Sequence, residues 1–399
     1  MFQVGAGVYK IGQKDGPVIE HSGQLSNVTV LMVFLQRGRG WQANMQPEKE
    51  RNDSNEKNDS AHESYQSNAY PFPLDAVVLA GTHQNQKRLI AGRNKAFLEV
   101  GGKILIRYVV DALLGAERIG QIFVVGPAEE LLEVMAGYSN RVRVIEQRGK
   151  MMTNCWAGIE ASEDCHRFDK LMPVNERPLL VISCDLPLVT AASIDDFISR
   201  CARQDNASEE PYAMLAGVID EPGVRPFHPD GGRPGIERPF VELEFGRLRL
   251  ANIYVGRPRQ LANQAFLQTG FSYRKAKDWR NVVALAFNFF KTQGGWQATW
   301  LTLRVQLTLM LSKGKGYWYK RLKKGNTRER VEKSVSQILG GPVKVVITPY
   351  GGLSLDVDDE EDFRILDKCY EQWAAITAAV DPESINELDP PPGSVSSRQ

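Results

Sequence analysis

Apolar and polar stretches alternate through the middle of the chain in a pattern typical of an α/β protein. The segments 75–80 (DAVVLA), 121–125 and 179–183 are nearly unbroken apolar runs. Such runs are typical of strands buried on both faces of a parallel sheet. The helices that we predict between or after them by apolar spacing are 104–114, 129–136, 153–161 and the segment from Thr190 onward. This alternation predicts βαβ units and a mostly parallel sheet.

Several of these elements have recognisable ends. Thr190 is expected to cap its helix, and Thr153 or Asn154 is expected to cap the helix at 153–161. The further strands that we predict are 142–145, 212–218, 240–245, 248–255, 343–348 and a short one at 353–357. The further helices that we predict are 278–291, 296–312 and 359–379, and the Pro- and Gly-rich segment 220–239 is predicted to be a long loop.

The two ends of the chain differ from the middle. Segment 45–68 is rich in Asn, Ser, Glu and Gln and has almost no aliphatic residues, so it lacks the apolar surface that would offset its ordering entropy. We predict a disordered or poorly ordered extension over 1–70, with Met45 as an alternative start of translation. The Pro- and Ser-rich tail 381–399 is also predicted to be disordered. One domain over 71–380 is left between them.

The composition excludes several classes of protein. Forty-two per cent apolar residues and a formal net charge of +1 describe a protein with no overall bias toward polyanions, so no nucleic-acid partner is expected. The five cysteines are odd in number and contain no CxxC pair, which fits a reducing cytoplasm. No apolar run reaches the ~18–20 residues of a membrane span. We therefore expect a cytoplasmic protein.

The stretch 75–105 carries the first candidate chemistry. Gly81 ends the first strand, and the loop after it contains Arg88 and other cations before Lys95. A loop after a buried strand, with backbone N–H groups and cations, suits a nucleoside triphosphate. The alternative interpretation is a solvated basic loop with no ligand.

Two phrases in this stretch resemble a known family. Leu79-Ala80-Gly81 begins a loop of the form LAGG…R…K, with Thr82 where the second glycine usually stands, and Lys95 to Leu105 follow the form K-x-hydrophobic-L-x-x-x-G-K-x-L. The chain thereby resembles the nucleotidyltransferases related to molybdenum cofactor guanylyltransferase, the MobA-like NTP transferases. The resemblance implies a GT-A-like, Rossmann-related three-layer α/β/α sandwich over 71–380, with a divergent acceptor-side region at 205–335.

The resemblance also implies an activity. Members of the family use Mg²⁺ to transfer a nucleotidyl group from an NTP to a phosphorylated small-molecule acceptor, with release of pyrophosphate. In this chain the implied catalytic residues are Lys95, Arg88 and Asp185. The implied nucleotide-binding residues are Leu79, Ala80, Gly81, Thr82, Lys95, Asn154 and Asp185. The base and the acceptor stay open, although GTP and molybdopterin are the substrates of the family's best-known members.

Two acidic positions are candidate metal ligands. Asp185 follows the apolar strand 179–183, where α/β sheets place ligands, and it matches the family's metal-binding "D-x-P" aspartate. The alternative is an Asp–Pro turn. Asp358 lies in the phrase Asp356 to Phe363, which resembles a phrase of sugar-activating relatives in which the matching aspartate is a second Mg²⁺ ligand. The alternative is that these carboxylates only complement a helix dipole.

Two asparagines and one basic region complete the candidates. Asn154 is placed where relatives read the base or ribose, and Asn252 is an acceptor-side candidate. The region 296–333 joins a mostly apolar helix to a run of Lys and Arg interleaved with Tyr and Trp. It has two functional interpretations, a weak peripheral contact with an anionic membrane or a cationic lid over the acceptor. The simpler alternative is a buried helix followed by a solvated basic loop.

Two other functions remain open. A glycosyltransferase that uses a nucleotide sugar would need an Asp-x-Asp motif at mid-chain, whereas the pattern occurs here at Asp356-Val357-Asp358. A non-catalytic nucleotide-binding protein on the same fold is favoured by Thr82 and the long loop that follows it.

Overall fold

The fold is described from a computed structural model. It covers residues 68–82, 89, 90, 92–238, 240–263 and 316–384, together with Arg304, Leu307, Thr308, Leu311 and Gly314. The predictions for Arg88, for the helix at 278–291, for nearly all of the extension 1–70 and for the tail beyond 384 lie outside the described residues. Of the helix predicted at 296–312, the described residues Arg304, Leu307, Thr308 and Leu311 are helical.

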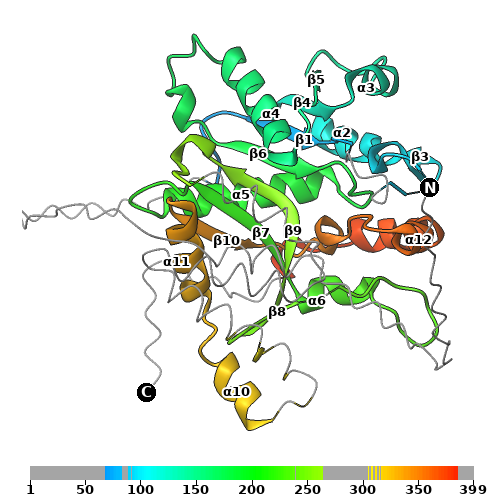
Figure 1. Ribbon diagram of the computed structural model, residues 1–399, viewed down its shortest axis with the longest axis vertical. Helices are drawn as coiled ribbons and strands as arrows, with labels where there is room; N and C mark the ends of the chain where they lie inside the picture. Colours follow the sequence, from blue (N-terminus) through cyan, green and yellow to red (C-terminus); the bar gives the residue numbers. More distant parts are fainter. Residues whose placement is uncertain are drawn as a thin grey trace, which may run out of the picture.

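An eight-stranded sheet forms the centre of the molecule (Figure 1). Its strands are β1 (Leu74–Leu79), β4 (Ile119–Gly126), β5 (Val142–Glu146), β6 (Leu179–Ser183), β7 (Met214–Asp220), β8 (Val241–Leu243), β9 (Gly246–Gly256) and β10 (Val343–Ile347). The order is β10-β7-β9-β6-β1-β4-β5, and β8 pairs with β9. Strand β9 runs antiparallel to β6 and β7, while the pairs β1–β4, β1–β6, β4–β5 and β7–β10 are parallel. The predicted mostly parallel sheet is confirmed.

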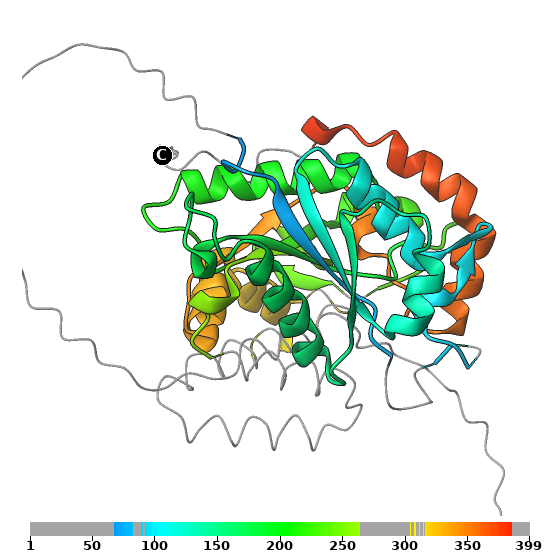
Figure 2. The ribbon, with the colours of Figure 1, turned by 90° about the horizontal axis from the view of Figure 1, so that it is seen from above.

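Helices cover both faces of the sheet (Figure 2). They are α2 (Leu105–Gly115), α3 (Ala128–Val134), α4 (Met151–Cys165), α5 (Ala191–Asn206), α6 (Glu221–Val224), α10 (Tyr317–Lys323), α11 (Arg328–Leu339) and α12 (Glu360–Ala378). Apolar residues of α2 and α5 pack on one face and those of α4 on the other, while α11 packs on β7 and β10. This arrangement is the α/β/α sandwich expected from the sequence.

The apolar run of β1 is explained by its position. β1 lies between β4 and β6, and Ala76, Val77 and Val78 are fully buried. Ala76 and Val78 belong to the core with α2 and α5, whereas Val77 belongs to the core with α4. A strand with both faces covered has no polar face to show in its sequence.

Helix α5 begins as its sequence predicts. The hydroxyl of Thr190 accepts from the N–H of Ser193, and the hydroxyl of Ser193 accepts from the N–H of Thr190, so both helix-end donors are satisfied. The helix then places Ile194 and Phe197 in the core. The end of β6 and the residues before α5 are therefore held at a fixed place over the sheet.

Three local predictions are wrong. Helix α4 begins at Met151 with Lys150 at its N-cap, because Gly149 turns the chain at φ 100° before the expected caps are reached. The strand predicted at 353–357 does not form: a 3₁₀ helix at Gly351–Ser354 takes its first two residues, and residues 355–357 have no regular structure. A side chain at Gly351 would meet the carbonyl of Gly223. The predicted loop 220–239 begins with α6 and a 3₁₀ turn, since Asp220 caps the N–H of Gly223.

No helix among the described residues is long and apolar enough to cross a lipid bilayer.

Candidate active site

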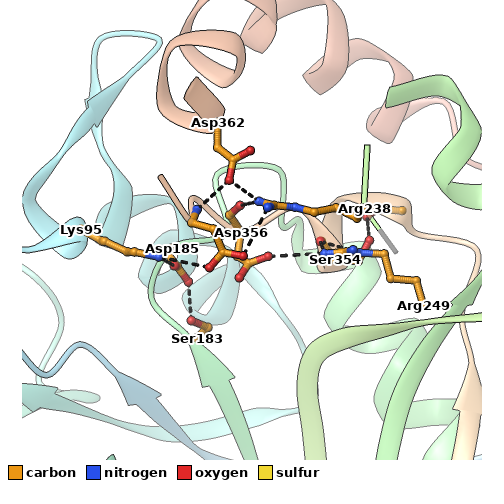
Figure 3. A network of polar contacts seen from close by, with 10 residues as sticks. Lys95, Ser183, Asp185, Arg238, Arg249, Ser354, Asp356 and Asp362 are labelled. Carbon is orange, nitrogen blue, oxygen red and sulfur yellow. Dashed lines mark hydrogen bonds and ion pairs between the residues drawn. The ribbon is translucent and has the colours of Figure 1, made fainter. Parts of the chain in front are cut away.

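Three residues predicted from distant parts of the chain meet at the carboxyl edge of the sheet. The ammonium nitrogen of Lys95 lies 3.4 Å from Oδ2 of Asp185 and 3.5 Å from Oδ1 of Asp358. Asp185 follows the end of β6, is 6 % exposed and accepts a hydrogen bond from the hydroxyl of Ser183. Figure 3 shows Lys95 reaching across to Asp185 and the acidic segment before α12. One cation thus faces two carboxylates in a mostly buried place.

Lys95 is held in place by the residue before it. It begins a 3₁₀ turn, Lys95–Phe97, whose N-cap Asn94 accepts from the N–H of Ala96. The side-chain amide of Asn94 also donates to the carbonyl of Ala80 at 2.9 Å and to the hydroxyl of Thr82 at 3.0 Å. Asn94 therefore joins the end of β1 to the start of the lysine turn. An asparagine before an apolar segment is a recognisable cap signal, but its long-range contacts leave no trace in the sequence.

The loop after β1 packs closely on Asn154. A Cβ at Gly81 would lie 2.3 Å from Nδ2 of Asn154, and Oδ1 of Asn154 accepts from the N–H of Arg148 at 2.6 Å. Asn154 is 3 % exposed, so its side chain is buried against this loop. It lies beside the predicted nucleotide loop, although its role with a nucleotide stays a prediction.

The four predicted nucleotide-binding residues Leu79 to Thr82 differ in what their N–H groups do. Leu79 pairs within the sheet, and the N–H of Ala80 donates to the carbonyl of Val125. The N–H of Thr82 donates to Oε1 of Gln147 at 2.8 Å, a contact that the sequence did not indicate. The N–H of Gly81 has no hydrogen-bond partner among the described residues. Of these four residues, Gly81 is therefore the one whose N–H is left to donate to a ligand.

The close contact at Gly81 leads to a prediction. Gly81→Ala is expected to displace Asn154 and to lower the free energy of unfolding by about 1–3 kcal/mol, as overpacking does. Urea unfolding measures this change. Gly246→Ala is the matched control, since nothing lies within 4 Å of a Cβ there. Equal stability of the two variants would show that Asn154 does not restrict Gly81.

Two buried arginines support the acidic segment before α12. Arg238 and Arg249 are each 1 % exposed. Arg238 lies 3.3 Å from Oδ2 of Asp358, forms an ion pair with Asp362 and donates to the carbonyl of Asp356 at 2.7 Å. Arg249 donates to the carbonyl of Ser354 at 2.8 Å and lies 3.6 Å from Oδ1 of Asp356. Figure 3 shows both guanidinium groups directed at this segment.

The charges of this network shift one another's pKa. Burial lowers the pKa of Arg238, but the carboxylates of Asp356, Asp358 and Asp362 more than offset it, so the pKa lies above its ordinary value. Burial raises the pKa of Asp362 to about 6, against the opposing effect of Arg238. Asp362 also accepts from the N–H of Asp358 at 3.0 Å. The network thus fixes both the backbone and the side chain of Asp358.

Asn252, the acceptor-side candidate, lies at the same end of the sheet. Its neighbour Ile253 in β9 pairs with Ile182 in β6, one residue before Ser183. The Nδ2 atom of Asn252 is buried and has no hydrogen-bond partner among the described residues. A buried amide without a partner is unusual in a folded protein. The position fits the acceptor-side prediction, and the role stays a prediction.

The family comparison agrees with the residues that led to the resemblance. Residues 76–217 match the MobA-like NTP transferase domain. The matched segment contains Lys95, Asn154 and Asp185, whereas Asp358, Arg238 and Asn252 lie beyond it. A search of curated proteins finds no match.

Three solved structures show how this chain compares in shape. A hypothetical transferase from Thermus thermophilus is 20% identical with a TM-score of 0.49, and the match covers 73% of this chain and 100% of that one. The 4-diphosphocytidyl-2C-methyl-D-erythritol synthase of Anaerococcus prevotii is 11% identical with a TM-score of 0.36, and the match covers 75% of this chain and 96% of that one. A CMP:2-keto-3-deoxy-manno-octonic acid synthetase in complex with CTP is also 11% identical. Its TM-score is 0.35, and the match covers 77% of this chain and 98% of that one.

Proposed function

We propose that the protein is a Mg²⁺-dependent nucleotidyltransferase, which transfers a nucleotidyl group from an NTP to a phosphorylated small-molecule acceptor and releases pyrophosphate. The observation that carries the proposal is the contact of Lys95 with both Asp185 and Asp358 at the carboxyl edge of the sheet. Open α/β sheets bind their ligands at this edge. The match of residues 76–217 to the MobA-like NTP transferase domain supports the same activity.

The donor atoms at this place fit Mg²⁺. The described residues contain no group of three or more His, Cys, Asp or Glu side chains arranged around one metal position. Mg²⁺ in nucleotide enzymes does not need such a group, because it is held by one or two carboxylates, by water and by the phosphates of the substrate. Asp185 and Asp358 would supply the two carboxylates. The bound ion would neutralise charge that develops on the phosphates.

The residues of the chain have distinct roles in the proposed reaction. Lys95 turns from the carboxylates to the phosphates, donates hydrogen bonds to their oxygens and stabilises the departing charge. The N–H of Gly81 donates to a phosphate oxygen beside it. An oxygen of the acceptor's phosphate forms a bond to the α-phosphorus as the bond to the pyrophosphate oxygen breaks. No general base is needed, because the acceptor phosphate is already ionised.

Arg238 has a supporting role in the proposed reaction. It contacts Asp358, Asp362 and the backbone of Asp356, so it holds the Asp358 carboxylate toward Lys95 without reaching a substrate itself. We therefore class Arg238 as a positioning residue. The acceptor would approach from the side of β9, where Asn252 supplies a buried amide.

Pyrophosphate release tests the proposal. The protein is incubated with each of the four common NTPs, Mg²⁺ and a panel of phosphorylated sugars, alcohols and pterins, and products are identified by mass spectrometry. We expect one NTP and one acceptor to give pyrophosphate and a nucleotide-linked product in equal amounts. Transfer from a nucleotide sugar instead would show a glycosyltransferase, and nucleotide binding without turnover would show a binding protein.

A further inference from the structure

Five exposed apolar side chains belong to α10 and to two segments that are held against it by hydrogen bonds. They come from three segments that are separate in sequence, and they are Phe245, Leu307, Leu311, Tyr317 and Trp318. Tyr317 and Trp318 are 67 % and 66 % exposed, and their rings lie 5.6 Å apart at 76°. Only three other large apolar side chains are exposed in the part of the chain that the structure describes. We call this group the α10 tip, and Figure 1 shows α10 projecting from the lower end of the molecule.

The α10 tip is built on a buried polar scaffold. Glu242 of β8 is 2 % exposed and binds the hydroxyl of Tyr319 at 3.0 Å. Asn326 is fully buried and donates to the carbonyl of Glu242 and to the hydroxyl of Thr308. Its own carbonyl accepts from the N–H of Glu244 at 3.0 Å. The turn between β8 and β9, the helical residues around Thr308 and α10 are therefore held together as one unit.

The charge around these apolar side chains is positive on balance, because three exposed cations outnumber the exposed Glu244 beside Phe245. Lys320, Arg321 and Lys324 are exposed on α10 or directly after it. Lys323 differs from them, since its ammonium turns inward to Glu242 at 3.5 Å. The carboxylate of Glu242 is buried beneath the tip and does not balance the exposed cations at the surface. The tip thus combines exposed aromatic and aliphatic side chains with three exposed cations.

We propose that the α10 tip binds the surface of an anionic lipid bilayer. Trp and Tyr side chains favour the interface between water and lipid, where the ring is buried and the polar atom stays wet. Lysine and arginine beside them attract anionic headgroups and extend their apolar stems into the interface. Leu307 and Leu311 are also exposed and are four residues apart, so they lie on one face of a helical segment that contacts α10 through Arg304 and Leu322.

A bilayer explains the tip better than a partner protein does. Protein interfaces concentrate arginine and aromatic residues around an apolar centre and are depleted in lysine. Two of the three exposed cations here are lysines, and they stand beside the aromatic pair. This composition matches amphipathic elements that lie on anionic membranes. The inference is independent of the proposed nucleotidyl transfer.

Vesicle sedimentation tests this inference on the full-length protein. We compare phosphatidylcholine vesicles with vesicles in which about a third of the lipid is phosphatidylserine or phosphatidylglycerol. We expect the protein to sediment with anionic vesicles and to be released by salt, as surface electrostatics require. Reversing Lys320, Arg321 and Lys324 to glutamate is expected to weaken the binding about 100-fold or more.

Single substitutions distinguish vesicle binding through the α10 tip from nonspecific binding through any exposed apolar side chain. Trp318→Glu is expected to remove at least nine tenths of the vesicle-bound protein. Phe168→Glu is the matched control, because Phe168 is 88 % exposed, stands beside Arg167 and lies outside the tip. The inference is overturned if the wild-type protein does not bind anionic vesicles, or if Trp318→Glu and Phe168→Glu bind them equally. It is also overturned if sedimentation velocity shows that the tip holds two copies of the protein together.

Discussion

Replacing Asp185 by asparagine is expected to reduce nucleotidyl transfer by about 10³-fold or more, a loss of several kcal/mol in transition-state stabilisation. Asp185 is buried beside Ser183 and faces Lys95, so it is the carboxylate that the end of β6 would supply to the metal ion. Asparagine keeps the size and one oxygen but loses the negative charge that a hard cation requires. The rate of pyrophosphate release with saturating NTP measures the effect.

A surface aspartate provides the control for this variant. Asp164 is exposed and forms an ion pair with Arg167, three residues later in the chain, so Asp164→Asn is expected to keep full activity. Thermal unfolding of both variants excludes a folding defect. Activity of Asp185→Asn above a tenth of the wild-type rate would remove Asp185 from the catalytic site.

Replacing Arg238 by methionine is expected to lower the free energy of unfolding by about 3–5 kcal/mol, because it leaves buried carboxylates without their cation. The side chain of Arg238 is fully buried, and it contacts both Asp358 and Asp362. Methionine has a similar length, so the change removes charge more than volume. Urea unfolding with a two-state fit measures the loss.

The position of Arg238 also predicts how the loss is relieved. Adding Asp362→Asn to Arg238→Met is expected to restore part of the stability, since one of the stranded charges is then absent. Arg233→Met is the control, because Arg233 pairs with Asp230 at the surface and is expected to change stability by less than about 0.5 kcal/mol. A loss below 1 kcal/mol for Arg238→Met would contradict the support that we assign to it.

The sequence predicts the sheet well because most of its strands are parallel and covered on both faces. β1, β4 and β6 appear as nearly unbroken apolar runs, and their carboxyl ends meet at one edge. That geometry brings the segments after β1 and after β6 to the same edge, and the family resemblance implied Lys95 and Asp185 as catalytic residues in these two segments. The family phrase at Asp356 to Phe363 added Asp358, which the structure places against the same lysine.

The supporting residues could not be predicted in the same way. Arg238 lies in a segment of Pro and Gly without any periodic pattern, and Arg249 is one of two arginines in strand β9. Their charges are paired with Asp362 and Asp356, more than a hundred residues away in sequence. Gln147 and Asn94 likewise act through contacts with the loop after β1. Propensity and periodicity carry no information about such pairs.

Calorimetric titration of the four NTPs, with Mg²⁺ and with a chelator, tests most directly that Lys95, Asp185 and Asp358 form a metal–NTP site. It needs no knowledge of the acceptor. We expect one NTP to bind at least tenfold more tightly with Mg²⁺, and Asp185→Asn to lose that dependence on the metal. Binding of no NTP, or binding that is equal with and without Mg²⁺ and unchanged in Asp185→Asn, would contradict the proposed site.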